Sequence, residues 1–134
     1  MATDLAPDPG IDEGELARLV PAFYTRIRAD AELGPIFNDA VENWPEHFGR
    51  LTDFWTSIML GTGRYKSNPV AAHRKHAARI APEMFDRWLA IWKATTGDMM
   101  SAGGAAALQD KAARIAESLK LALYFKLPPK GDRA

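Results

Sequence analysis

The chain has 134 residues, enough for one domain with a hydrophobic core but not for two. Hydrophobic residues make up 47% of it and charged residues 25%, which is ordinary for a globular protein and unlike a disordered or membrane-embedded one. The 17 basic residues balance the 17 acidic ones, so charge gives no reason to expect binding to nucleic acid or to an anionic membrane.

The chain contains no cysteine. Disulfides, thiolate nucleophiles and cysteine-ligated zinc or iron–sulfur sites are therefore excluded. No apolar run approaches the length of a membrane span, and the N-terminus lacks the basic-then-apolar order of a signal peptide. We therefore expect a cytoplasmic protein.

The N-terminal part is predicted to contain two short helices after a tail. Residues 1–11 are rich in proline, glycine and aspartate, which indicates a flexible tail. A first helix is expected near Asp12, and Pro21 favours the first turn of a second helix, where its missing N–H costs nothing. The glycine–proline pair at 34–35 predicts a break in regular structure, followed by Phe37 as an apolar plug.

Two helices joined by a loop are predicted in the middle of the chain. Residues 46–60 have a helical period, and their apolar stripe consists of His47, Leu51, Trp55 and Ile58. The glycines, asparagine and proline of residues 61–69 indicate a loop. A further helix is expected over about 69–79, with His73 on its apolar side and His76 beside it.

Two longer helices are predicted in the C-terminal part. The first begins at Pro82, and its apolar stripe includes Phe85, Trp88 and Trp92. The glycines at 103–104 indicate a turn, and a last helix is expected over 105–126, followed by a tail at 127–134. Because no strand pattern, repeat or linker is evident, the sequence predicts one all-α domain over residues 12–126.

Familiar catalytic motifs are absent from the sequence. It has no phosphate-binding glycine loop, no metalloprotease HExxH pair and no nucleophile elbow. Most carboxylates fall on polar helix faces, where solvated charge is the simplest interpretation. The histidines and aromatic residues are therefore the better candidates for a site.

Two polar residues on apolar faces have alternative interpretations. His47 could shield the end of a core helix, or it could be a polar gate over a cofactor cavity. Tyr24 could be a core tyrosine with its hydroxyl at the surface. A buried tyrosine and histidine directed at one point would instead donate hydrogen bonds to a bound diatomic ligand.

His73 and His76 are three residues apart, so both can lie near one helix face. Zinc could use such a pair, but the sequence shows no third ligand of suitable type and spacing. Haem requires only one strong axial imidazole and a large apolar wall. Aromatic residues on predicted inner faces could form that wall, although they could equally form an ordinary core. They are Phe23, Phe37, Phe54, Trp55, Phe85, Trp88 and Trp92.

Three runs of the sequence resemble a known family. They are AFYTRIRADAELGPIFN, WPEHFGRLTDFWTSIMLGTGRYKSNPVAAH and FDRWLAIW. In this order they resemble the group III truncated haemoglobins of bacteria, and the resemblance covers about Leu16 to Lys126. It implies an all-α, globin-like fold, namely a truncated two-over-two helical sandwich around haem b.

The resemblance also implies roles for individual residues. His73 matches the proximal iron ligand, with His76 as the alternative, and Tyr24, His47 and Trp88 match the surroundings of the bound ligand. His47 could also bind the iron itself in the unliganded state. The candidate partners for the haem propionates are Arg64, Tyr65 and Arg79. The full set of predicted haem-binding residues is Phe37, His47, Leu51, Trp55, Tyr65, His73, His76, Ile80, Phe85 and Trp88.

Such a site is expected to bind dioxygen and other small ligands, including nitric oxide, cyanide and sulfide, reversibly. Hydrogen bonds from Tyr24 and Trp88 should stabilise bound dioxygen and slow its escape. Nitric oxide oxidation or peroxide turnover is compatible with this site and would need an electron donor. We expect a monomer or weak dimer. The alternatives are a cofactor-free helical interaction or regulatory module, which would be colourless, and a helical hydrolase, which would contain zinc.

Overall fold

The computed structural model describes residues 11–65, 73 and 80–123, and every regular element in these ranges is a helix. The helices are α1 (Glu13–Ala29), α2 (Gly34–Ala40), α3 (Trp44–Leu60), α5 (Pro82–Met99) and α6 (Ala102–Leu123). The all-α prediction is confirmed. His73 is helical, whereas the rest of the helix predicted over 69–79 lies outside the described residues.

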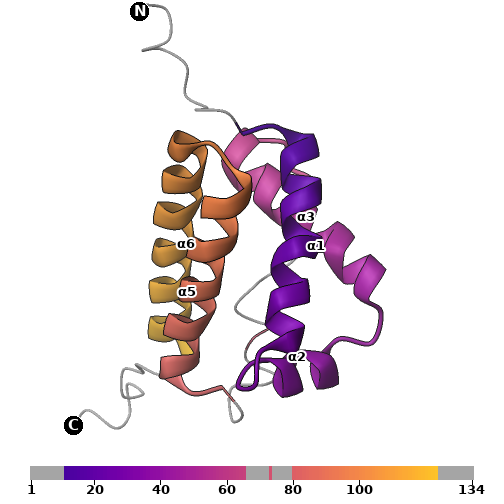
Figure 1. Ribbon diagram of the computed structural model, residues 1–134, viewed down its shortest axis with the longest axis vertical. Coiled ribbons are helices and arrows are strands. Elements are labelled where there is room, and N and C mark those ends of the chain that lie inside the picture. The colour runs from indigo at the N-terminus through magenta and orange to yellow at the C-terminus, as the bar shows by residue number, and fades with distance from the viewer. Residues whose placement is uncertain (1–10, 66–72, 74–79, 124–134) are drawn as a thin grey trace, which may run out of the picture.

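Helix α1 occupies the middle of the arrangement (Figure 1). It contacts α3, which crosses it, and also α5 and the short α2. Helices α5 and α6 lie side by side as an antiparallel pair. Helix α1 therefore packs against α3 on one side and against α5 on the other.

Helix α1 is continuous through Pro21, so the prediction of two helices there is wrong. It begins at a capping box, in which the Glu15 backbone N–H donates to the Asp12 carboxylate at 2.7 Å and the Asp12 N–H donates to Glu15 at 3.1 Å. A single buried face continues on both sides of the proline and consists of Leu16, Leu19, Val20, Phe23, Tyr24 and Ile27. Burial of this face outweighs the cost of about 3 kcal/mol for proline inside a helix.

Two glycine-containing segments that were predicted to interrupt regular structure are helix starts. Gly34 and Pro35 open α2, because proline is favourable in the first helical turn. The Ser101 hydroxyl accepts a hydrogen bond from the Gly104 N–H at 3.1 Å and caps α6. Both glycines of the predicted turn therefore lie in the first turn of α6. In each case a neighbouring proline or serine outweighs the glycine signal.

Helix α3 confirms the helix predicted over 46–60 and begins two residues earlier. The Asn43 side chain caps it by accepting from the Glu46 N–H at 3.0 Å, and Gly61 ends it in the left-handed conformation at φ 73°. Within its predicted apolar stripe, Trp55 is buried, while the other three residues, His47, Leu51 and Ile58, are half-buried. Helix α3 therefore presents an incompletely covered apolar face.

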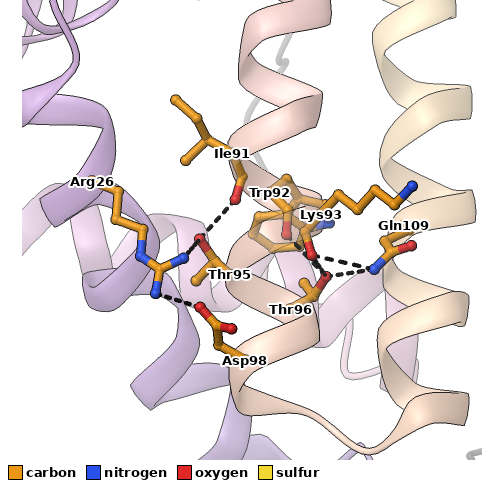
Figure 2. Close-up of polar contacts among 8 residues, drawn as sticks. All are labelled: Arg26, Ile91, Trp92, Lys93, Thr95, Thr96, Asp98 and Gln109. Carbon is orange, nitrogen blue, oxygen red and sulfur yellow. Dashed lines mark hydrogen bonds and ion pairs between the residues drawn. The ribbon is translucent and has the colours of Figure 1, made fainter.

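Hydrogen bonds connect α5 to both of its neighbours (Figure 2). Toward α6, the Gln109 side-chain amide donates to the buried Thr96 hydroxyl at 2.9 Å. Toward α1, the Arg26 guanidinium donates to the Thr95 hydroxyl at 3.2 Å and pairs with Asp98 at 2.7 Å. These contacts fix the position of α5 along both partner helices.

The core extends beyond the helices at the N-terminal side. Ile11, which falls in the predicted tail, is only 3% exposed and belongs to the main hydrophobic cluster.

None of the described helices combines the length and the apolar character needed to cross a membrane.

Candidate functional site

Tyr24 lies at the centre of an aromatic cluster formed by α1, α2 and α3, which we call the Tyr24 cluster. Tyr24 is 5% exposed. Its ring centroid lies 5.5 Å from that of His47 and 5.8 Å from that of Phe37. The rings of Trp44 and Phe48 follow at 6.0 and 6.5 Å. The structure thus brings together three residues that were predicted for the site: Tyr24, Phe37 and His47.

The Tyr24 hydroxyl keeps its proton. Burial raises the pKa of Tyr24 well above its ordinary value of 10.0, and a hydrogen bond with the Trp88 side chain opposes this only in part. An indole N–H can donate but not accept, so the Tyr24 oxygen is the acceptor in this pair. The tyrosine proton is then available to a further partner. Phe23 packs edge-on against both rings, at 4.8 Å from Tyr24 and 5.2 Å from Trp88.

His47 has a buried nitrogen for which the described residues provide no hydrogen-bond partner. This atom is Nε2, and the ring that carries it packs edge-on against Tyr24 and Trp44, each at 5.5 Å. Buried polar atoms are nearly always paired, so an unpaired one points to a position where a ligand binds. Burial lowers the pKa of His47 from 6.5, and the charges of Arg50 and His73 lower it further. The imidazole is therefore neutral near pH 7.

His73 lies within electrostatic range of His47, because its charge contributes to the lowered pKa of that residue. It is half-buried and helical. His47 and His73, on either side of the predicted loop, therefore lie near enough to interact. The alternative ligand His76 and the propionate candidate Arg79 lie outside the described residues.

The other predicted haem contacts divide between two hydrophobic clusters. The main hydrophobic core is larger than the Tyr24 cluster. It includes Tyr24 and Trp55, and Phe37, Leu51 and Trp88 pack against it. Phe85 is buried against α6 in a second cluster, and Ile80 packs on the outside of that cluster. The predicted apolar wall is therefore concentrated around Tyr24, with Ile80 and Phe85 set toward α6.

Two of the three candidate propionate partners are described, and both contact neighbours. Arg64 forms an exposed ion pair with Glu13 at 2.7 Å. Tyr65 is half-buried, its backbone N–H donates to the Ser57 hydroxyl at 2.9 Å, and its ring packs edge-on against Phe54 at 5.0 Å. Arg64 is thus paired with a carboxylate of α1, whereas Tyr65 stays beside the apolar face of α3.

Sequence reasoning missed Trp44. Its ring contacts both Tyr24 and His47, and the Arg28 guanidinium lies 4.5 Å from its ring centroid. Trp44 precedes His47 by three residues, a spacing that places two side chains near one helix face. This signal was available, but the predicted helix began after Trp44.

The described residues fit haem better than a site for a bare metal ion. Within ranges 11–65, 73 and 80–123, no three histidine or carboxylate side chains gather as metal ligands. Haem needs one axial imidazole and apolar walls. The region offers His73, the unpaired Nε2 of His47 and the half-buried apolar residues around Tyr24.

Comparisons with known proteins agree with this fit. The model of the bacterial-like globin family matches residues 10–125. The group 3 truncated hemoglobin ctb of Campylobacter jejuni is 34% identical over 87 residues, which is 62% of this chain and 68% of that relative. The crystal structure of the group III truncated hemoglobin from Campylobacter jejuni matches with a TM-score of 0.79 and 28% identity, over 90% of this chain and 98% of that one.

The family model and the solved structure each match most of the chain, and they confirm the truncated-globin fold that the sequence predicted. Membership of a globin family implies that the protein binds haem. The chain belongs to the bacterial-like globins, among the group III truncated haemoglobins.

Proposed function

We propose that the chain binds haem b with His73 as the axial ligand and takes up dioxygen reversibly beside Tyr24, His47 and Trp88. The observation that carries this proposal is the meeting of a protonated tyrosine with an unpaired histidine nitrogen inside an aromatic cluster. When bound, haem iron supplies a coordination position for dioxygen, nitric oxide, cyanide or sulfide. The residues around it determine how tightly such a ligand is held.

Tyr24 and Trp88 act together on the ligand in this proposal. Because Trp88 adjoins the Tyr24 hydroxyl closely enough to affect its pKa, we propose that a ligand atom beside the hydroxyl also lies within reach of the indole N–H. Hydrogen bonds to a charged acceptor are worth about 1.5–3 kcal/mol, which corresponds to dissociation slowed by about 10- to 150-fold. Their apolar surroundings strengthen such bonds relative to water. We therefore infer slow ligand release.

His47 has two roles available to it. A neutral imidazole carries one N–H donor and one acceptor nitrogen, so Nε2 can donate to a ligand or present a lone pair to iron. Both roles use the neutral form, which burial and the charges of Arg50 and His73 favour. We propose that His47 donates a hydrogen bond to the ligand when one is present. When no ligand is present, its Nε2 atom would occupy the iron's ligand-binding position instead.

Slow release suits ligand chemistry better than bulk oxygen delivery. Nitric oxide oxidation and peroxide turnover are two reactions that the same hydrogen bonds would support, with electrons from a separate reductase. We propose that the protein acts in the cytoplasm and that it is a monomer or a weak dimer.

An absorption spectrum of the purified protein after haemin addition tests the proposal. We expect a strong Soret band in the wild type and in His76→Ala, and its collapse in His73→Ala. Collapse only in His76→Ala would transfer the axial role to that residue. No Soret band with excess haemin would refute haem binding and favour a cofactor-free helical interaction module.

A further inference from the structure

Trp88 is stacked on a second tryptophan, Trp92, one turn later on α5. The two rings are nearly parallel, at 8°, with centroids 5.6 Å apart. Phe23 packs edge-on against both, at 5.2 Å from Trp88 and 4.8 Å from Trp92. Trp88 is half-buried, whereas Trp92 is 1% exposed. The ring nearer the ligand therefore rests on one that is completely enclosed.

Three helices hold Trp92 in place. Its indole N–H donates to the Leu108 carbonyl of α6 at 3.1 Å. Its ring also stacks on Trp55 of α3 at 4.6 Å and 18°, while Phe23 covers an edge from α1. A carbonyl oxygen has two lone pairs, so accepting from Trp92 leaves Leu108 free to keep its helical hydrogen bond. Any rotation of Trp92 would break this bond and both ring contacts.

The orientation of Trp88 depends on such a support. The torsion that sets an aromatic ring plane is broad and nearly two-fold, so neighbours select the plane. Stacking on Trp92 selects it here, and the Tyr24 oxygen selects which edge carries the N–H. If the support were removed, the indole N–H would sample directions away from Tyr24.

We propose that Trp92 is a positioning residue for Trp88 and transmits the position of α6 to the ligand-binding hydrogen bonds. This inference rests on the proposed function of Tyr24 and Trp88. Helix α6 would then affect ligand retention through the bond between Trp92 and Leu108, although α6 itself would not contact the ligand.

The test compares Trp92→Phe with wild type and with two reference variants, all as full-length protein loaded with haem. Trp88→Phe removes the donor itself. Thr96→Val is the matched control, because Thr96 is also buried on α5 against α6, one turn beyond Trp92, and bonds to Gln109 (Figure 2). The readouts are the dioxygen dissociation rate and the indole N–H signal of Trp88 in nitrogen-15 NMR spectra of the carbon monoxide form.

We expect Trp92→Phe to shift or broaden the Trp88 signal and to raise the dissociation rate about fivefold, because the smaller ring covers less of Trp88 and has no N–H to hold it at the Leu108 carbonyl. Thr96→Val should lower thermal stability and leave both readouts at wild-type values. Wild-type values of both readouts in Trp92→Phe would overturn the inference. If Trp92→Phe does not fold, Trp92→Tyr can be tested in the same way, because the tyrosine hydroxyl keeps a polar group near the Leu108 carbonyl.

Failure of the proposed function gives a different pattern. If Trp88→Phe releases dioxygen at the wild-type rate, Trp88 is not part of the ligand network, although the NMR signal still reports on its orientation by Trp92. If the wild type takes up no haem, the same NMR comparison on haem-free protein tests the support of Trp88 directly. An unmoved Trp88 signal in Trp92→Phe would refute the inference there as well.

Discussion

Trp88 and Trp92 lie one turn apart on the same helix and stack on each other, yet their surroundings differ. Trp92 belongs to the α5–α6 seam, the contact that also includes Thr96, Leu108 and Gln109, where its N–H and the Thr96 hydroxyl have protein partners. Trp88 lies beside the Tyr24 cluster. There its side chain acts on the pKa of Tyr24, and the His47 Nε2 atom has no hydrogen-bond partner among the described residues.

The difference separates a stabilising contact from a binding contact. Polar groups in the α5–α6 seam pair with one another, so the seam needs nothing from outside the chain. The Tyr24 cluster keeps the Nε2 atom of His47 in buried surroundings, where leaving it unpaired costs free energy. A ligand that pairs with this atom recovers that cost. Unused hydrogen-bonding capacity, rather than aromatic content, is what distinguishes the site.

The largest expected effect on stability comes from removing Trp92. Trp92→Ala should lower the free energy of unfolding by about 3–5 kcal/mol, because it leaves a cavity in the α5–α6 seam and removes the hydrogen bond from the indole to the Leu108 carbonyl. Trp88→Ala should cost clearly less, because Trp88 is only half-buried. Urea unfolding of both variants measures the difference. Equal losses would erase the distinction between the two regions.

Acid should weaken a third contact, the ion pair between Asp30 at the C-terminal end of α1 and Arg87 of α5. The Arg87 guanidinium donates twice to the Asp30 carboxylate, at 2.8 and 2.6 Å, and the backbone N–H groups of Glu32 and Leu33 donate to it at 3.0 Å. Arg87 is the main cause that lowers the pKa of Asp30 below its ordinary 3.8, with the backbone donors adding to it. The folded state thus favours the charged carboxylate.

The stability from this charge is complete above the unfolded pKa of 3.8 and is lost as pH falls through the lower folded value. Asp30→Asn should therefore be less stable than wild type by a constant amount at higher pH, and the gap should shrink as the solution becomes more acidic than pH 3.8. Urea unfolding across this range measures it. The effect of Thr96→Val in the α5–α6 seam, which has no titrating partner, should not depend on pH. A gap for Asp30→Asn that stays constant at all pH values would contradict the assignment.

The smallest effect should come from Arg26. Its ion pair with Asp98 is exposed, at 42% and 61% of the side chains, so Arg26→Met should change the free energy of unfolding by less than about 1 kcal/mol. Added salt should reduce this difference further. A loss as large as that of Trp92→Ala would show that the α1–α5 contact, and not the α5–α6 seam, holds α5 in place.

Local sequence patterns predicted helices where α1, α3, α5 and α6 lie but not all of their limits, and they predicted a break where α2 begins. The apolar periods of α3 and α5 were sufficient, because each buries one face. Pro21 and the glycines at 103–104 predicted interruptions that the structure does not have, because burial of a continuous face and a serine cap outweighed their local preferences. These outcomes depend on tertiary contacts that a single segment does not display.

The site was only partly predictable. Tyr24 and His47 were assigned through the family resemblance, since spacing alone left both as ordinary core or boundary residues. The unpaired His47 Nε2 and the bond from Trp92 to the Leu108 carbonyl are properties of packing between helices that are distant in sequence. The interval between Trp92 and that carbonyl carries no motif, and only the fold brings them together.

We propose that Tyr24 and Trp88 hold the ligand as one unit, and a double-mutant cycle of dioxygen dissociation measures whether they do. We expect Tyr24→Phe and Trp88→Phe each to raise the rate by about tenfold or more. The double variant should exceed either single variant by much less than the product of the two effects, because the residues share one hydrogen bond. A wild-type dissociation rate in Tyr24→Phe, or two effects that simply multiply, would contradict the account.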